Sequence, residues 1–177
     1  FDEGKIPLIW ARILIEENDF KSAIEKLKIS EAIFQKRNDR RMVATVYLEF
    51  ANLFVQDDNF IEAEKYIDLV IEYCSKVQGF NMQYLPECMR LYAASDITLD
   101  EIDQVYENVA QFQDDPNIYS QWYFLSRAYE KVKSHSRSTQ CRELSIKSLK
   151  KLSSYNAVKG HCDSMLKNHW LHRKILN

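Results

Sequence analysis

The chain has 177 residues, of which 46% are hydrophobic and 12% aromatic, and its formal net charge is −2 at pH 7. This apolar content suffices for a folded core and argues against an intrinsically disordered chain. With only three Gly and three Pro, and no apolar run of about eighteen residues, the composition favours an all-helical protein without a transmembrane helix.

Two stretches forty residues apart predict the organisation of the N-terminal half. Residues 18–27 and 58–67 each contain a polar turn, then an aromatic residue, then a small residue three positions later. Such self-similarity at a fixed period is typical of stacked helix-turn-helix units. The first predicted helix begins near Pro7, and its apolar positions are Ile6, Ile9, Trp10, Ile13 and Leu14. Further helices are expected at 20–37, 41–56 and 60–77, with Gln78-Gly79 ending the last of them.

In the C-terminal half, helix-start signals predict the boundaries. Pro86 is expected near a helix start, because proline inside a helix is costly. Thr98 and Glu101 have the spacing of a capping box, and Asp115 followed by Pro116 is typical of an N-cap and first helical residue. A turn at 133–136, slightly longer than its counterparts, and a helix at 138–152 follow. The expected single domain thus contains repeats at about 6–38, 40–78, 81–113 and 116–153, and a terminal helix at 156–176.

These patterns resemble the tetratricopeptide-repeat (TPR) family. The small and large positions of its signature are matched in the first two units by Ala11, Leu14, Phe20, Ala23 and Leu27, then by Ala51, Phe54, Phe60, Ala63 and Ile67. The fourth unit matches with a three-residue insertion, through Ser126, Tyr129 and Cys141, whereas the third fits poorly. The resemblance implies an all-α, right-handed superhelix of about four helix pairs plus a terminal helix. The long period is similar to that of Rap/PlcR-type peptide sensors and MalT-like transcription regulators.

The sequence offers little for catalysis or metal binding. It lacks a phosphate-binding glycine loop and the G-x-S-x-G and H-E-x-x-H motifs, so we expect neither an enzyme nor a cofactor. The nearest approach to a metal cluster is His161, Cys162, His169 and His172, and we expect these residues to pack rather than to bind metal. The four cysteines, Cys74, Cys88, Cys141 and Cys162, are widely spaced. They are expected to be free thiols in a reducing cytoplasm, with two disulfides as the alternative.

Charge is distributed unevenly along the chain. Residues 1–130 carry 13 Lys and Arg against 24 Asp and Glu, whereas residues 131–177 carry 11 against 2 and hold all four His. A basic end can bind nucleic acid, but these basic residues lie around several helix faces and no DNA-binding motif occurs. We therefore expect a solvated basic end and no nucleic-acid partner.

The TPR resemblance implies a concave groove for a peptide on the first helix of each pair. The groove positions would be Arg12, Glu16, Thr45, Asn52, Gln56, Arg90, Tyr123, Arg127 and Lys131. Arg12, Asn52 and Arg127 occupy equivalent positions, and such a column of donors could hold an extended peptide by its backbone or carboxylates. The alternative is that these are ordinary exposed polar residues.

We expect non-catalytic recognition of a protein or peptide, as the sensing or scaffolding part of a larger cytoplasmic regulatory protein. The absence of an initiator Met agrees with a segment of a longer polypeptide. A first alternative is a MalT-like regulator that senses a small molecule or an inhibitory protein. A second is self-association through aromatic residues at the ends of the array.

Overall fold

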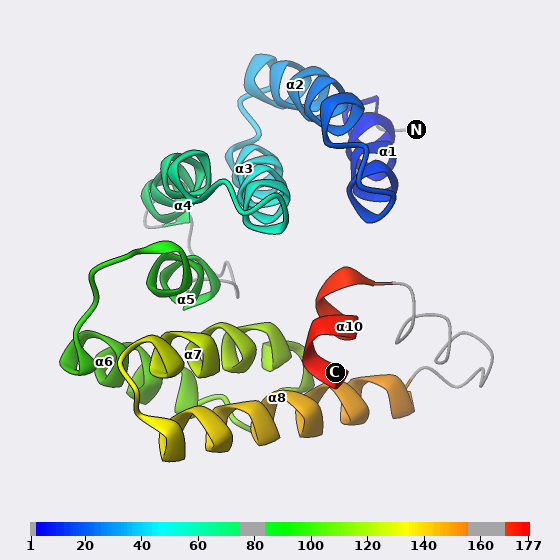
Figure 1. Ribbon diagram of the computed structural model, residues 1–177. Helices are drawn as coiled ribbons and strands as arrows, with labels where there is room; N and C mark the ends of the chain where they lie inside the picture. The colour runs from blue at the N-terminus through cyan, green and yellow to red at the C-terminus, as the bar shows by residue number, and fades with distance from the viewer. Residues whose placement is uncertain (1–2, 75–83, 156–168) are drawn as a thin grey trace. The chain divides into compact units, whose positions relative to one another are not determined.

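The computed structural model describes residues 3–74, 84–155 and 169–177, and every regular element in these ranges is a helix (Figure 1). The predicted all-α class is therefore confirmed for the described residues. They divide into an N-terminal unit, Phe1–Pro86, and a C-terminal unit, Glu87–Asn177. The elements are α1 (Lys5–Glu16), α2 (Phe20–Lys36), α3 (Arg40–Gln56), α4 (Phe60–Cys74), α5 (Tyr84–Ala93), α6 (Leu99–Ala110), the 3₁₀ helix η1 (Pro116–Ile118), α7 (Tyr119–Lys131), α8 (His135–Tyr155) and α10 (Trp170–Leu176).

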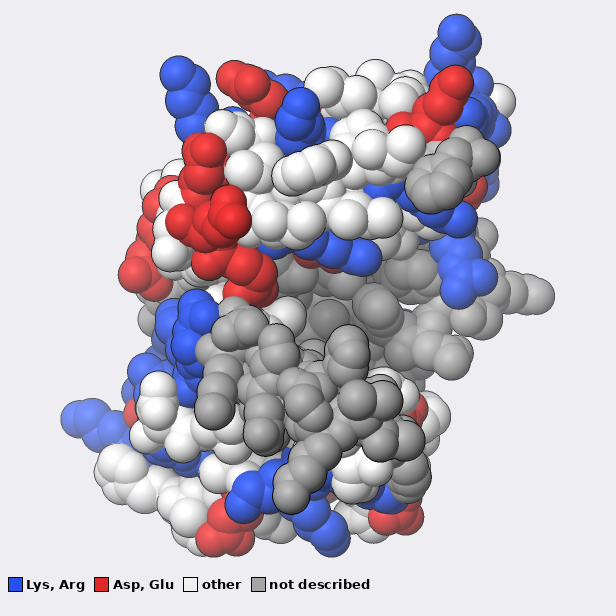
Figure 2. All heavy atoms as spheres, turned by 90° about the vertical axis from the view of Figure 1, so that its right-hand side faces the viewer, with Lys and Arg blue, Asp and Glu red and all other residues white. Residues whose placement is uncertain are grey.

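Two helical hairpins build the N-terminal unit. Helix α1 pairs with α2 and α3 pairs with α4, while α2 and α1 both also contact α3. The short residues predicted for the helix crossings, Ala11, Ala23, Ala51 and Ala63, are all fully buried. A methyl side chain at a crossing lets the two helix axes approach closely. Figure 2 looks onto the side of this unit where α1 lies, and shows an uncharged area between charged edges.

One turn design connects the helices of this unit. Its first residue has left-handed backbone and its second caps the next helix. The left-handed residues are Asn18, Asn38 and Asp58, with φ of 61°, 53° and 54°. Asn and Asp tolerate this conformation better than other side-chain-bearing residues. The Asp19 and Asp39 carboxylates then accept hydrogen bonds from the backbone N–H of Ser22 (3.2 Å) and Met42 (3.1 Å), so each turn ends one helix and begins the next.

Helix α7 is the centre of the C-terminal unit. Its residues from Ser120 to Ser126 are all buried. It packs against α6, α8 and η1, and its aromatic side chains also reach α5 and α10, where Phe124 contacts Tyr92 and Tyr119 contacts His172. Facing α7, helix α8 buries Ser138, Cys141, Ser145 and Ser148, whose small side chains permit close packing.

Three predicted boundaries in the C-terminal unit are tested by the structure. The capping box is confirmed, since Thr98 Oγ1 accepts from Glu101 N (3.3 Å) and Glu101 Oε2 accepts from Thr98 N (2.8 Å). Asp115 caps as predicted, but Pro116 opens η1 and the α-helix begins three residues later. The prediction of a longer turn at 133–136 is wrong. Lys133 has φ 59° and α8 begins at His135, so the turn has the same design as the others and needs no insertion.

Other expectations are met in part or lie outside the described residues. Cys88 and Cys141 are free and buried, and burial raises the pKa of both thiols, to about 12 for Cys141. Gln78-Gly79 and the start of the expected terminal helix lie outside the described ranges, as do His161 and Cys162. No helix in the described ranges is long and apolar enough to cross a membrane.

Candidate functional site

The predicted binding residues divide between the two units. Arg12, Glu16, Thr45, Asn52 and Gln56 belong to the N-terminal unit. Arg90, Tyr123, Arg127 and Lys131 belong to the C-terminal unit. Within the N-terminal unit, Thr45, Asn52 and Gln56 follow one another along α3 at spacings of seven and four residues, which places them on one face of the helix. Each unit therefore carries its own candidate surface.

In the N-terminal unit, an ion pair joins the first helices of the two hairpins. Arg12 of α1 donates through Nε to Glu49 Oε1 of α3 at 2.8 Å, and a second guanidinium nitrogen lies 2.7 Å from the same oxygen. The Glu49 side chain is largely buried, with 14% exposed, whereas half of the Arg12 side chain remains exposed. The pair therefore fixes the position of Arg12 and still leaves much of this side chain accessible.

Gln56 also serves to join α3 to α1. Its Nε2 donates to the Ile15 carbonyl oxygen (3.1 Å) and to Asn18 Oδ1 (2.9 Å), the left-handed residue of the first turn. Its Oε1 is buried and accepts no hydrogen bond from the described residues. Gln56 thus has a structural role at one end of the candidate row.

Asn52 differs from its neighbours on α3. Thr45 Oγ1 donates within its own helix to the Arg41 carbonyl oxygen (3.0 Å), a common arrangement for a helical threonine. The Asn52 side chain is half-buried, and its amide makes no hydrogen bond with the described residues. An amide carries two donor hydrogens and a carbonyl acceptor. Asn52 can therefore bond to a peptide group without losing a bond within the described unit.

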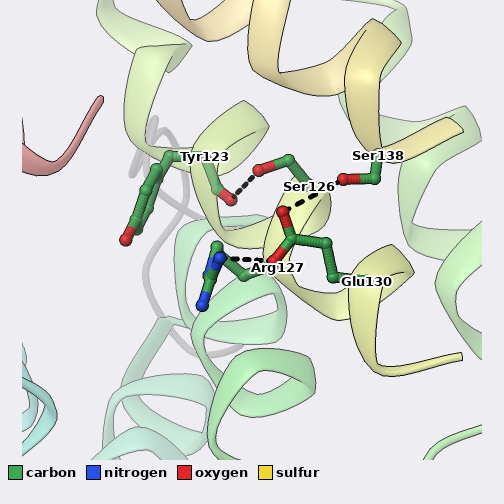
Figure 3. Close-up of polar contacts among 5 residues, drawn as sticks. All are labelled: Tyr123, Ser126, Arg127, Glu130 and Ser138. Atoms are coloured by element: carbon green, nitrogen blue, oxygen red, sulfur yellow. Dashed lines mark hydrogen bonds and ion pairs between the residues drawn. The ribbon is translucent and has the colours of Figure 1, made fainter. Parts of the chain in front are cut away.

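The C-terminal surface is built along α7 (Figure 3). Tyr123 and Arg127 lie four residues apart, on one face of the helix, but Tyr123 is buried whereas Arg127 is exposed. The Arg127 guanidinium is paired with Glu130, and Glu130 Oε1 accepts a long hydrogen bond from Ser138 Oγ of α8 (3.4 Å). Burial is the main cause that raises the pKa of Tyr123, so this phenol stays protonated at neutral pH.

Lys131 and Arg90 have different surroundings. Lys131 Nζ donates to the carbonyl oxygens of Tyr92 and Ala94 (2.8 Å to Ala94), at the C-terminal end of α5. Lysine there satisfies carbonyl groups that have no partner within the helix and complements the helix dipole. Partial burial lowers the Lys131 pKa. Arg90 is exposed. Burial raises the pKa of the nearby Glu87 carboxyl, and the positive charge of Arg90 partly offsets this rise.

Two of the histidines that the sequence singled out, His169 and His172, contact each other at the C-terminal end. The rings of His169 and His172 stack with centroids 4.3 Å apart, and Tyr119 contacts His172 edge-on at 5.0 Å. Burial, and then the nearby His172 and Arg173, lower the pKa of His169 to about 4. In the described part of the chain, no group of three or more His, Cys, Asp or Glu is arranged to hold a metal ion.

Comparisons of the chain with protein-family models, with curated proteins and with solved structures found no match. The relation to TPR proteins is therefore a hypothesis that rests on the residue pattern and the helix pairing.

Proposed function

We propose that this chain is a TPR-like helical-repeat array that binds an extended peptide segment of a protein partner without catalysis. The peptide would lie along α3 beside α1 in the N-terminal unit. The observation that carries the proposal is the half-buried Asn52 amide, which has no hydrogen-bond partner among the described residues and lies on the same helix face as Thr45 and Gln56.

The repeated hairpin design supports a TPR-like array. Left-handed turn residues recur every twenty residues at Asn18, Asn38 and Asp58, so the turns within the two successive hairpins, at Asn18 and Asp58, lie forty residues apart. Fully buried alanines lie at equivalent positions of both hairpins. Repeats of this kind bury a continuous core only by stacking on their neighbours, and they present long surfaces to extended ligands.

The chemistry of this face suits a peptide backbone. The Asn52 amide can donate to a peptide carbonyl and accept from a peptide N–H, which recognises the main chain and leaves its side chains free. Arg12, held by Glu49, adds a positive charge for a carboxylate of the ligand. We assign this activity to the recognition part of a cytoplasmic regulatory protein, with no chemical change to the bound segment.

Selection from a random peptide library displayed on phage, with the immobilised chain as bait, tests the proposal. Peptides so selected should bind Asn52→Ala about tenfold to a hundredfold more weakly than the wild type, because a buried peptide group is left without its partner. Asn108→Ala is the matched control, since Asn108 is also a half-buried helical asparagine but lies on α6. Failure to select any peptide, or equal binding by Asn52→Ala, would refute the proposal.

A further inference from the structure

Helix α1 carries an apolar stripe on the side that faces away from its neighbours. Its buried residues are Leu8, Ala11 and Ile15. The opposite side presents Ile6, Ile9, Trp10 and Ile13, which are 41%, 52%, 55% and 43% exposed. The i, i+3, i+4, i+7 spacing aligns these four side chains in one row. The sequence predicted these residues as apolar positions of the first helix, and the structure leaves them exposed on it.

This stripe is unlike the other exposed apolar residues of the described ranges. Those residues are single side chains spread over four helices and one turn, namely Ile29, Ile61, Leu99, Phe112 and Leu176. Scattered apolar residues are normal on a protein surface, whereas a contiguous patch bounded by charges marks an interaction site. In Figure 2 the uncharged area on the α1 side of the N-terminal unit has charged side chains gathered at its edges.

We propose that the α1 stripe binds the same stripe of a second copy of this chain, with the two α1 helices antiparallel about a two-fold axis. A two-fold interface uses the same surface on both partners, so that surface must be self-complementary. With the axis midway between Ile9 and Trp10, Ile9 of one copy faces Trp10 of the other, and Ile6 faces Ile13. Each apolar side chain of the row then meets another apolar side chain.

The charged residues at the two ends of the stripe favour a second copy of the chain as the partner, and they favour antiparallel pairing of the two α1 helices. Lys5 lies at the N-terminal end of the stripe and Glu16 and Glu17 lie at its C-terminal end. Lys5 and Glu16 are eleven residues apart, about three helical turns, so both flank the stripe on the same edge. In this register, antiparallel copies bring Lys5 to within two residues, or ~3 Å along the helix axis, of Glu16 of the partner at both ends, whereas parallel copies would place like charges together. The opposed helix dipoles add to this preference.

The small size of the stripe determines how tightly the two copies should bind. Helix α1 has 12 residues and is therefore roughly 18 Å long. One helix face on each copy falls below the ~1,200 Å² of total buried surface that is usual for a stable complex. The dimer should therefore be weak, with monomer at low micromolar concentration and dimer approaching the millimolar range.

Sedimentation velocity of the whole chain over that concentration range measures the dimer. Trp10→Lys should raise the dissociation constant at least about a hundredfold, because a central aromatic is lost from both halves of the interface. Ile61→Lys, which changes an isolated isoleucine with 74% exposure on α4, is the control and should dimerise as the wild type does. A wild type that stays monomeric throughout, or a Trp10→Lys variant that dimerises normally, would overturn the proposal.

Charge reversal tests the direction of pairing. Lys5→Glu or Glu16→Lys alone should weaken the dimer roughly threefold to tenfold, because each puts like charges together at both ends of the interface. The double variant Lys5→Glu/Glu16→Lys restores opposite charges and should recover wild-type affinity. Parallel pairing predicts no such recovery, so additive losses in the double variant would reject the antiparallel arrangement. This proposal does not depend on peptide binding by α3.

Discussion

Replacing Gln56 and Asn52 by alanine should separate the structural residues of the α3 face from those available to a ligand. Gln56→Ala removes two hydrogen bonds to α1 and its turn, at 3.1 Å and 2.9 Å. At a net ~0.5–1.5 kcal/mol for each bond, and with Gln56 only half-buried, the loss should be about 1–2 kcal/mol of unfolding free energy. Asn52→Ala removes no hydrogen bond within the described unit and introduces a better helix former. Its effect should stay within about 0.5 kcal/mol of zero.

Urea unfolding followed by far-UV circular dichroism measures both variants under the same conditions. Gln104→Ala is the control for loss of a glutamine side chain, since Gln104 is exposed on α6 and should show almost no change. The reasoning is refuted if Asn52→Ala destabilises the chain as much as Gln56→Ala, because Asn52 would then have a structural partner. It is equally refuted if Gln56→Ala unfolds at the wild-type urea concentration.

Three further changes test the fold. Asn38→Val should cost about 1–2 kcal/mol, because a β-branched side chain is strained at a φ of 53°, whereas Asn38→Gly should be close to neutral; thermal melts distinguish the two. Tyr129→Phe should cost about 1–2 kcal/mol in urea unfolding, because it deletes the 2.5 Å hydrogen bond from the Tyr129 hydroxyl to the Asp103 carboxylate. Native His169, with its pKa lowered to about 4, does not take up the proton that the unfolded chain binds below about pH 6.5. Stability should therefore fall as pH drops from 6.5 towards 4, by up to about 3 kcal/mol, and His169→Gln should show a shallower fall in melting temperature over this window.

The turns show how much of the fold the sequence determines. Asn-Asp and Asp-Asn pairs combine tolerance of left-handed backbone with a capping side chain, so the boundaries near 19, 39 and 59 could be predicted closely. The turn at Lys133 has the same backbone, but lysine carries no such signal. The sequence therefore misplaced the start of α8 by three residues. Tertiary packing of α7 and α8, rather than local preference, determines the backbone at that turn.

The candidate site was harder to predict, because its contacts join residues far apart in the chain. A helical pattern places Arg12 and Gln56 on particular faces, but it does not reveal that Glu49 lies against Arg12 or that Gln56 reaches Ile15. Lys131 was likewise chosen as a groove residue, and its bonds to the end of α5 give it a structural role as well. The Asn52 side chain, in contrast, makes no hydrogen bond with the described residues, so it remains available to a ligand.

Helices α1 and α7 show why an apolar pattern alone could not say what is buried. Both are apolar around much of their circumference, which in a soluble protein indicates a helix covered on several sides. Around α7 the C-terminal unit supplies that cover, and residues 120–126 are buried without a gap. Around α1 the N-terminal unit covers only the side of Leu8, Ala11 and Ile15. The proposed partner copy would supply the other half, so that α1 in the dimer would be enclosed as α7 is within its own unit. The fluorescence of Trp10 can report this directly, because Trp122 and Trp170 are buried and Trp10 is the tryptophan open to a soluble quencher. Quenching should decline as the chain is concentrated, and constant quenching would mean that the outer face of α1 stays in water.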